Sequence, residues 1–171
     1  GWNVDLEQGY ADDLALDFGW QVESTASRGR WSLGDPAGTS NGGGLINPEL
    51  DVAGDCRDRA YVTGNAGGSP SSDDVDEGGT LLTSPEFDAT GAEDPHVRYQ
   101  YWFHNSGGNG PVNDALTISL ANGTDTVVIQ TVTAPNGVNV SEWRPSNIRI
   151  ADHIAATSTM RLLVYTADEE P

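Results

Sequence analysis

The sequence predicts an all-β protein, an antiparallel two-sheet β-sandwich of the jelly-roll type. Short segments alternate apolar and polar residues, which is the pattern of a strand with one buried face. Turn-forming residues separate these segments, and the 171 residues include 21 Gly and 9 Pro. Helical periodicity is almost absent, with short candidates only at residues 48–52 and 152–156.

The clearest strand is predicted at residues 97–104, where large apolar and polar side chains alternate. Residues 116–120 alternate in the same way, residues 126–133 do so less cleanly, and residues 161–166 are predicted as the last strand. The earlier strands are expected at residues 20–25, 30–33, 60–63 and 81–84. The predicted turn clusters are residues 35–44, 64–79, 105–113, 121–125 and 134–139. Many short strands between such turns are typical of a sandwich or jelly roll.

The composition limits the classes of function. A chain of 171 residues suits a single domain spanning residues 1–171 and is long enough to bury a core. Its formal net charge is −18 and its 8 basic residues are all Arg, so it lacks the basic face that nucleic acids and anionic membranes require. We interpret this acidity as a source of solubility. The chain starts at Gly1 without a visible signal peptide, and we expect a mature or excised segment.

The most distinctive segment is the acidic run, residues 73–77, which contains four carboxylates and is followed by two glycines. Such carboxylates repel one another unless solvent or a cation relieves them, and Ca²⁺ prefers hard oxygen ligands. The spacing of Asp74, Asp76 and Gly78 is similar to the start of an EF-hand loop. The acid due at the twelfth position is replaced by Pro85, and no flanking helices are predicted, so the run is not an EF-hand. A composite calcium site and a merely solvated acidic loop both remain open.

A resemblance to a known family rests on the order and spacing of several short motifs. They are Gly19-Trp20, Gly29-Arg30-Trp31, Gly34-Asp35-Pro36, Tyr61-Val62-Thr63-Gly64-Asn65, Asp74-Val75-Asp76, Gly79-Thr80-Leu81-Leu82-Thr83-Ser84-Pro85 and Tyr101-Trp102-Phe103. From about Asp5 to Asp168 the chain resembles the MAM-like, carbohydrate-binding-like jelly-roll accessory domains of secreted bacterial proteins. Those domains are often attached to peptidases or glycan-degrading enzymes.

The resemblance implies a two-sheet sandwich that holds a structural Ca²⁺ ion, is secreted, and has no catalysis of its own. It implies that the ion is bound by oxygens from loops distant in sequence. The implied ligands, together with Asp74 of the acidic run, are Glu7, Asp55, Asn65, Asp76 and Asp168. Such a site would tie both ends of the chain to the central loop. Cys56 is the one cysteine, so an internal disulfide could not do the same.

A second candidate site is one face of the strand predicted at residues 97–104. This face carries a guanidinium, an amide, an indole and an imidazole, from Arg98, Gln100, Trp102 and His104. Aromatic faces stack on the C–H groups of sugars and planar donors pair with hydroxyls, so the row suits a polysaccharide.

The last predicted strand extends this interpretation, because Arg161 and Tyr165 share one of its faces. The alternative is that Trp102 belongs to the core and that the polar side chains of the row serve their neighbours. Core or rim packing is also what we expect of the tryptophans Trp20, Trp31 and Trp143.

Catalytic patterns are weak. Residues 38–42 match the G-x-S-x-G nucleophile elbow formally, but they lie in a glycine-rich loop rather than between a strand and a helix. The three histidines lack zinc-binding spacing. Cys56 has Arg57 and Arg59 nearby, but we expect a small buried residue rather than a nucleophile. Paired acids for glycoside hydrolysis have no diagnostic value where carboxylates are so abundant.

Together these patterns favour a non-catalytic, calcium-stabilised binding module of a larger secreted protein. Its expected partners are a polysaccharide or glycan and the neighbouring domains of the same polypeptide. Two other classes remain open. One is a structural or adhesive domain that contacts proteins through an exposed apolar patch. The other is a jelly-roll polysaccharide lyase or hydrolase with a deep groove.

Overall fold

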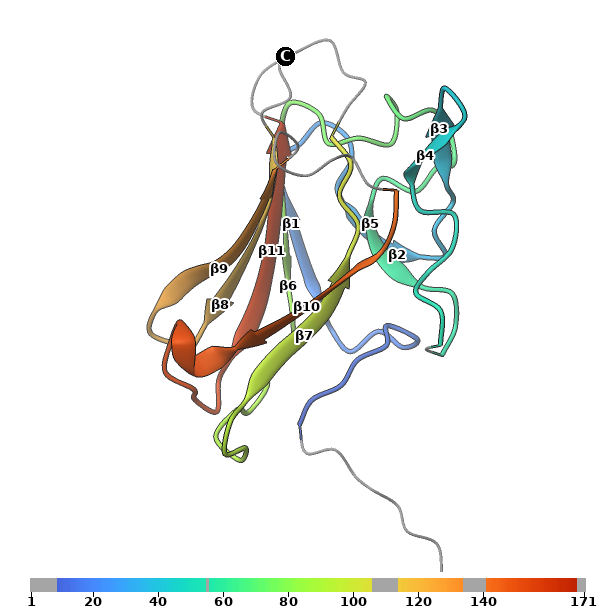
Figure 1. Ribbon diagram of the computed structural model, residues 1–171. Helices are drawn as coiled ribbons and strands as arrows, with labels where there is room; N and C mark the ends of the chain where they lie inside the picture. The colour runs from blue at the N-terminus through green and yellow to red at the C-terminus, as the bar shows by residue number, and fades with distance from the viewer. Residues whose placement is uncertain (1–8, 55, 106–113, 134–140, 169–171) are drawn as a thin grey trace, which may run out of the picture.

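A computed structural model describes residues 9–54, 56–105, 114–133 and 141–168, and this part of the chain is all-β (Figure 1). Eleven strands and one short 3₁₀ helix, η1 (Ile150–Asp152), are formed there. The strands are β1 (Gln21–Ser24), β2 (Trp31–Gly34), β3 (Thr39–Asn41), β4 (Gly44–Asn47), β5 (Ala60–Thr63), β6 (Gly78–Thr83), β7 (His96–Tyr101), β8 (Ala115–Ala121), β9 (Thr126–Thr133), β10 (Arg144–Arg149) and β11 (Arg161–Asp168). Within these ranges no helix is long and apolar enough to cross a membrane.

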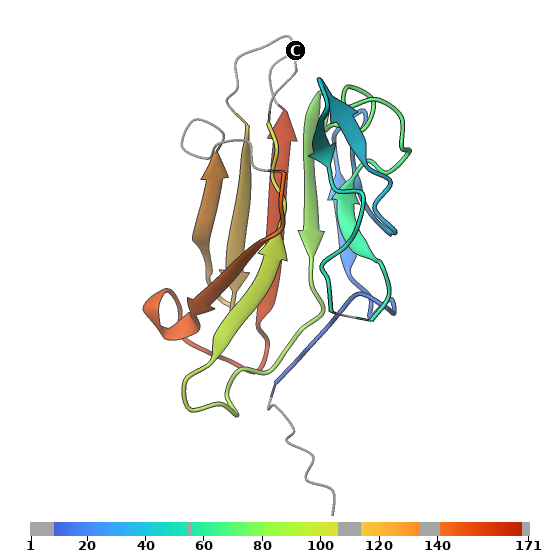
Figure 2. The same ribbon diagram turned by 45° about the vertical axis from the view of Figure 1, so that its right-hand side comes forward.

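The strands form several antiparallel sheets. The largest has five strands in the order β1-β6-β11-β8-β9, so β1 and β9 are its edges. The other three sheets are the pairs β10–β7, β2–β5 and β3–β4. Figures 1 and 2 show that the pair β10–β7 lies across one face of the five-stranded sheet, with β2–β5 and β3–β4 beyond it on the same side. The arrangement is sandwich-like, with its second layer divided into separate pairs.

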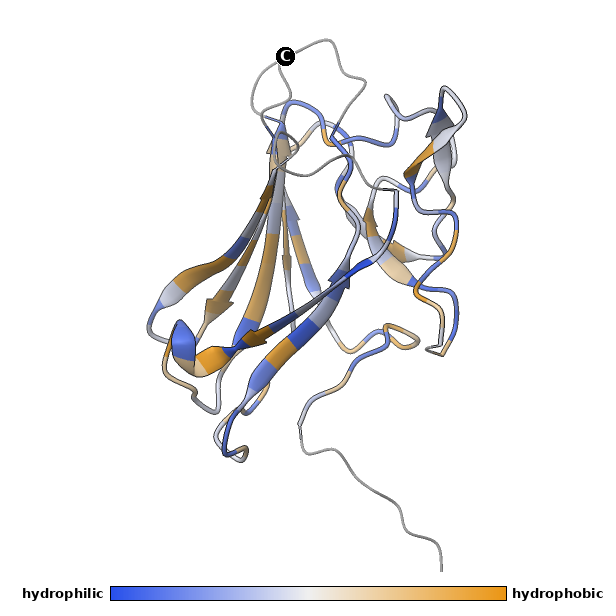
Figure 3. Ribbon diagram, viewed as in Figure 1, coloured by the Kyte–Doolittle hydropathy of each residue, from blue (hydrophilic) through white to orange (hydrophobic). Residues whose placement is uncertain are grey.

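Apolar and polar residues alternate along the central strands, and the apolar ones form the buried face of the five-stranded sheet. In β8, Leu116, Ile118 and Leu120 are buried while the residues between them are partly exposed. Strand pairing places Val164 of β11 beside Ile118, and Leu82 of β6 beside Val164. These side chains form one continuous apolar surface, because neighbours across an antiparallel pair share a face. Figure 3 shows this alternation of apolar and polar residues along the strands.

The pair β10–β7 packs on this surface through apolar and polar contacts. Val97 of β7 belongs to a buried cluster with Leu120, Ile150 and Met160. A polar bridge accompanies it, since the carboxamide oxygen of Gln130 accepts hydrogen bonds from Tyr99 Oη at 2.5 Å and Ser146 Oγ at 3.1 Å. The three residues come from β9, β7 and β10, so this bridge holds both layers together.

Trp31 fastens the pair β2–β5 to the five-stranded sheet. Its backbone N–H donates to Thr80 Oγ1 at 3.2 Å, and its indole N–H donates to the Thr80 carbonyl at 3.3 Å. Thr80 is fully buried in β6. These two hydrogen bonds therefore join the β2–β5 pair to β6.

Most strands predicted from alternation are confirmed, and the differences have physical reasons. Strand β7 ends at Tyr101 rather than continuing to residue 104. The glycine-rich region at residues 35–44 was predicted as a turn but contains β3 and the start of β4. The predicted one-turn helix at residues 48–52 does not form, whereas η1 overlaps the start of the other candidate. Strand β10 was not predicted at all, because Pro145 and its polar neighbours give no apolar alternation.

Two further predictions concern Cys56 and two of the turns. Cys56 is exposed, so the prediction of a small buried residue is wrong. The turn predicted at residues 134–139 lies outside the described ranges, as does the turn predicted at residues 105–113 except for Asn105.

Candidate aromatic groove and acidic end

A large open cavity lies between the five-stranded sheet and the walls formed by β7 and the β2–β5 pair. Its volume is about 1380 Å³. Core-facing side chains such as Leu82, Ile118 and Thr166 line it on the side of the sheet and are 8% exposed or less, so this part of the cavity lies within the layers. Pockets for small molecules measure roughly 300–1,000 Å³, so this groove has room for an extended ligand.

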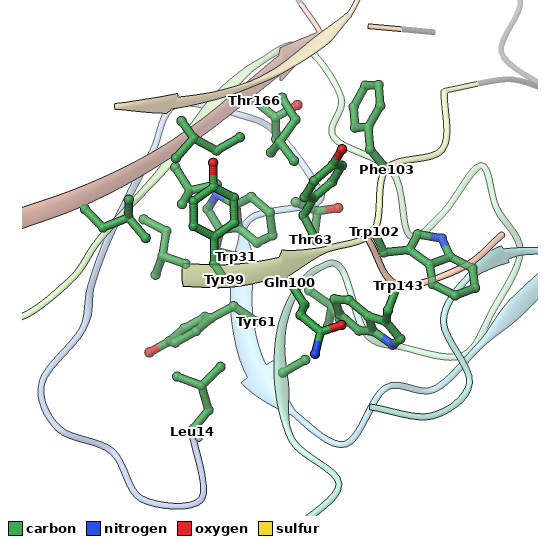
Figure 4. Close-up of a pocket in the computed structure, with 18 of the residues that line it drawn as sticks. Leu14, Trp31, Tyr61, Thr63, Tyr99, Gln100, Trp102, Phe103, Trp143 and Thr166 are labelled. Atoms are coloured by element: carbon green, nitrogen blue, oxygen red, sulfur yellow. The ribbon is translucent and has the colours of Figure 1, made fainter. Parts of the chain in front are cut away.

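Aromatic side chains dominate the walls of the groove. Ten aromatic side chains of the described residues line it, and Figure 4 shows Trp31, Tyr61, Tyr99, Trp102 and Trp143 around the open space. Gln100 and Tyr99 leave opposite faces of β7, yet both reach the groove (Figure 4). The walls therefore combine large apolar ring surfaces with a polar group on β7.

The tryptophans of the groove use their indole N–H groups within the protein. Trp102 donates to the carbonyl of Ile46 at 2.7 Å, and Trp143 donates to the carbonyl of Leu50 at 2.9 Å. The two rings meet edge to face, with centroids 6.0 Å apart. Trp20 donates to Asp12 and Trp31 to Thr80. These rings are thus held in fixed positions, and what they can offer a ligand is the carbon surface of the ring.

The structure brings four of the six predicted ligand-binding residues to this groove, since Arg98, Gln100, Trp102 and His104 all line it. Arg98 and Gln100 are exposed on β7, while Trp102 and His104 follow the strand and are half-buried. Burial lowers the pKa of the His104 imidazole below its ordinary value of 6.5. Trp102 serves both interpretations made from the sequence, because it packs against Trp143 and also faces the cavity.

The other two predicted residues lie elsewhere, because β11 belongs to the five-stranded sheet and β7 does not. The guanidinium of Arg161 donates to the Ser84 carbonyl and to Glu86, both at 3.1 Å. Tyr165 lies on the outer face of the sheet over Gly79, where an added Cβ would come within 2.3 Å of the phenol oxygen. The predicted extension of the row by Arg161 and Tyr165 is therefore not formed.

The acidic run lies at one end of the groove, and its first residue has a structural role. Asp73 is 2% exposed. Its carboxylate accepts hydrogen bonds from the backbone N–H groups of Ala66, at 3.3 Å, and Gly68, at 3.1 Å. The preceding loop is thereby folded around the carboxylate, as buried charged groups require hydrogen-bond partners.

Arg28 provides a cation for the acidic run that the sequence did not reveal. Its guanidinium forms an ion pair with Asp76, with Nε donating to Oδ2 at 3.0 Å. The two backbones also form a bridge, in which Ser27 N–H donates to the Asp76 carbonyl at 2.8 Å. Gly29 follows with a positive φ of 73°, and an added Cβ would lie 2.0 Å from the Asp74 carbonyl oxygen. The backbone of the acidic run is therefore packed against residues 27–29, while Asp74 and Glu77 remain exposed.

Three other carboxylates at this end remain in mutual repulsion. The pKa of Asp74 is raised by partial burial and by the charges of Asp76 and Asp168. The pKa of Asp114 is raised by partial burial and by the charges of Asp168 and Asp74. Asp74, Asp114 and Asp168 come from the acidic run, the start of β8 and the end of β11, so three distant segments bring negative charge to one place.

The calcium ligands predicted from the sequence are partly assembled. Asp74 and Asp168 influence each other, whereas Asp76 is paired with Arg28. Asn65 is used structurally, since its amide donates to the Asp35 carbonyl and accepts from Ala37 N–H, both at 2.8 Å. Glu7 and Asp55 lie outside the described residues. Within the described ranges no three His, Cys, Asp or Glu side chains are close enough to hold a metal ion as they stand.

Two residues of the acidic end were missed by the sequence interpretation. Arg28 gave no pattern of its own, because an isolated arginine near a glycine has many explanations. Asp114 could have been found from strand pairing: Leu116 lies opposite Thr166, so the residue two before Leu116 is brought toward Asp168. The alternation identified β8 and β11 but could not show that they were neighbours.

Comparison with known proteins gives no match: no family model fits the chain, and no curated protein or solved structure matches it. The resemblance to MAM-like accessory domains therefore stays a prediction.

Proposed function

We propose that the chain is a non-catalytic carbohydrate-binding module, a jelly-roll β-sandwich whose groove holds a polysaccharide. The observation that carries this proposal is the open groove of about 1380 Å³ lined by ten aromatic side chains. Sugar rings present C–H faces that pack on aromatic carbon, and their hydroxyls pair with planar side chains. Trp102 and Trp143 supply such surfaces, and Gln100 lies beside them on β7.

Rigidity supports this role. The indole N–H bonds to Ile46 and Leu50 fix the two rings before any ligand arrives. A fixed ring loses little conformational freedom on binding, so more of its contact energy contributes to affinity. The cavity volume of about 1380 Å³ also exceeds the roughly 300–1,000 Å³ of a small-molecule pocket, which suits a polymer.

The test is binding to a panel of soluble β-linked oligosaccharides by isothermal titration calorimetry, with Trp143→Ala as the main variant. We expect saturable binding to at least one oligosaccharide and a loss of about tenfold or more for the variant, from removal of one aromatic contact. Tyr165→Ala is the matched control, because it removes an aromatic ring on the outer face of the five-stranded sheet. Thermal melting of each variant checks that it is folded. Absence of binding to the whole panel would overturn the proposal.

We also propose that Ca²⁺ binds at the acidic end and stabilises the fold there. The support is the gathering of Asp74, Asp114 and Asp168 from three distant segments, together with the hard oxygen chemistry of their carboxylates. Partial burial first, and the charges of neighbouring aspartates second, raise the pKa values of Asp74 and Asp114, and a bound cation would offset both effects. Asp168 would be the third ligand. The ion would join the acidic run to β8 and β11, which lie far from it in sequence.

Calcium titration of the melting temperature tests this second proposal, with Asp74→Asn and Asp114→Asn as variants. Both variants should melt higher than the wild type in chelator, because each removes repulsion, and both should lose the gain on adding Ca²⁺. A wild-type melting temperature that is the same in chelator and in excess Ca²⁺ would overturn it. Asp58→Asn, an exposed site away from the groove, controls for the change in net charge.

The same experiments separate the remaining classes. We propose secretion as part of a larger protein, on the resemblance alone. An adhesive domain would bind proteins through exposed apolar residues such as Leu16, Phe18 and Leu50, and would ignore the oligosaccharides. A lyase or hydrolase would release shorter products from a polymer, which chromatography after incubation would detect.

A further inference from the structure

The hydrogen-bonding inventory of the groove is strongly one-sided. Among the residues that the structure describes, ten aspartates line it, against three arginines. Ionised carboxylates only accept hydrogen bonds, whereas guanidinium groups only donate them. Some of these carboxylates are already used, since Asp73 is buried against backbone N–H groups, Asp76 is paired with Arg28, and Asp94 is paired with Arg149. The remaining aspartates still outnumber the arginines, so a ligand meets more acceptors than donors on entering this groove.

Most of the indole and guanidinium donors that line the groove are already used. The four tryptophan N–H groups donate to protein acceptors. Arg28 is paired with Asp76, and Arg59 donates to the Ala15 carbonyl at 3.4 Å. Arg98 and Gln100 are the donors on β7 that face the groove from an exposed position. A ligand rich in acceptors, such as a uronate or a sulfated sugar, would be both repelled and poorly hydrogen-bonded here.

A positively charged donor fits the same groove on two counts. An ammonium group carries three donors and no acceptor, which matches acceptor-rich walls. Cations are also attracted to the faces of tryptophan and tyrosine rings, and those faces are what the fixed rings present. A Ca²⁺ ion at the acidic end would offset only part of the charge of ten aspartates, so the groove would remain negative.

We propose that the polysaccharide bound in this groove carries free amino groups, as a polymer of glucosamine does. This inference rests on the proposed function, because it assigns the chemical class of the ligand in the same groove. Sugar rings stack on the aromatic walls, and the ammonium groups lie toward the carboxylates of the groove. Neutral sugars can stack on the aromatic walls but have no ammonium group for the carboxylates. Acidic sugars are repelled by the carboxylates.

The test compares four hexamers by calorimetry at pH 6: β-1,4-linked glucosamine, its fully N-acetylated form, the corresponding glucose oligomer, and oligogalacturonate. The first two share a backbone and differ in the charge on nitrogen. We expect the glucosamine hexamer to bind about tenfold tighter than the acetylated one, from several partly exposed charge pairs. The advantage should shrink at high salt. Oligogalacturonate should bind weakest.

Variants locate the effect. Asp13→Asn removes one groove carboxylate that is not among the proposed Ca²⁺ ligands, and it should weaken glucosamine binding two- to fivefold while leaving the glucose oligomer unchanged. Arg98→Gln should strengthen glucosamine binding by a similar factor, because it removes the exposed positive charge on β7. Asp58→Asn is again the control outside the groove.

The outcomes separate the preference for amino sugars from the carbohydrate-binding function. If the acetylated or glucose hexamer binds as tightly as the glucosamine hexamer, the inference is overturned while the carbohydrate-binding function stands. If none of the hexamers binds, both fail. Hexalysine serves as a test of simple charge attraction: binding equal to that of the glucosamine hexamer, with Trp143→Ala without effect, would also overturn the inference.

Discussion

Asp73 offers a sharp test of how the acidic run is held. The prediction concerns Asp73→Ala, which removes a carboxylate that is 2% exposed and accepts two backbone N–H bonds, from Ala66 and Gly68. Both N–H groups lose a charged acceptor in this variant. The loop before the acidic run should then lose its fixed shape.

The expected cost follows from these two bonds. Hydrogen bonds to charged groups contribute about 1.5–3 kcal/mol each, and two that share one acceptor do not add fully, so we expect a loss of about 2–4 kcal/mol. For a chain of this size each 1 kcal/mol lowers the melting temperature by roughly 2–4 °C, which gives a decrease of about 4–16 °C. Asp73→Asn keeps one acceptor oxygen and should lose about half as much.

The assay is thermal and urea unfolding of wild type, Asp73→Ala, Asp73→Asn and the exposed control Asp58→Ala, each measured in chelator and in Ca²⁺. Measurement under both conditions separates the hydrogen bonds from any effect of the ion. The control should stay within about 0.5 kcal/mol of wild type, as surface substitutions do. If Asp73→Ala unfolds as the control does under both conditions, the carboxylate does not hold this loop.

Three further predictions address the layers, the close approach at the acidic run and the pH response. Gln130→Leu removes the shared acceptor of two hydroxyls between the layers and should cost about 1–3 kcal/mol of unfolding free energy, measured in urea. Gly29→Ala places a Cβ 2.0 Å from the Asp74 carbonyl oxygen at a φ of 73°, so it should cost about 2–5 kcal/mol. Gly42→Ala, with φ of 60° and nothing within 4 Å, should show only the conformational part of that cost. Burial lowers the pKa of His104, so the unfolded chain binds a proton at this imidazole at a higher pH than the folded chain does. The free energy of unfolding should therefore fall as the pH decreases below about 6.5, and His104→Gln should flatten this dependence. The same pH profile in wild type and variant would contradict a lowered pKa for His104.

The strands were predictable wherever packing imposed a period of two. Residues 60–63 and 126–133 were predicted with the bounds that the structure has, and β8 was predicted to within one residue at each end. One face of each segment lies against the core, so apolar and polar residues alternate in its sequence. Where strands bury little, as in β3, β4 and β10, the same signal is weak, and pairing with a neighbour determines the conformation instead.

The site was predictable in its parts but not in its assembly. The alternation in β7 identified Arg98 and Gln100 as one face, and both reach the groove. Their partners Tyr61 and Trp143 come from distant segments, and only the tertiary arrangement brings them together. Tyr165 was correctly predicted to lie on a strand, but the sequence could not show that this strand belongs to a different sheet from β7.

The edge strand β9 has a consequence for how the protein behaves in concentrated solution. Its eight residues, Thr126–Thr133, contain no charge, proline or glycine, and Val128 is 53% exposed. The other edge, β1, is only four residues long and carries Glu23. With a net charge of −18, molecules in dilute buffer repel one another over a Debye length of about 30 Å at 0.01 M salt, but over only about 3 Å at 1 M. High salt therefore removes the long-range repulsion that keeps molecules apart. Association through the exposed edge strand β9 should then be strongest at high salt.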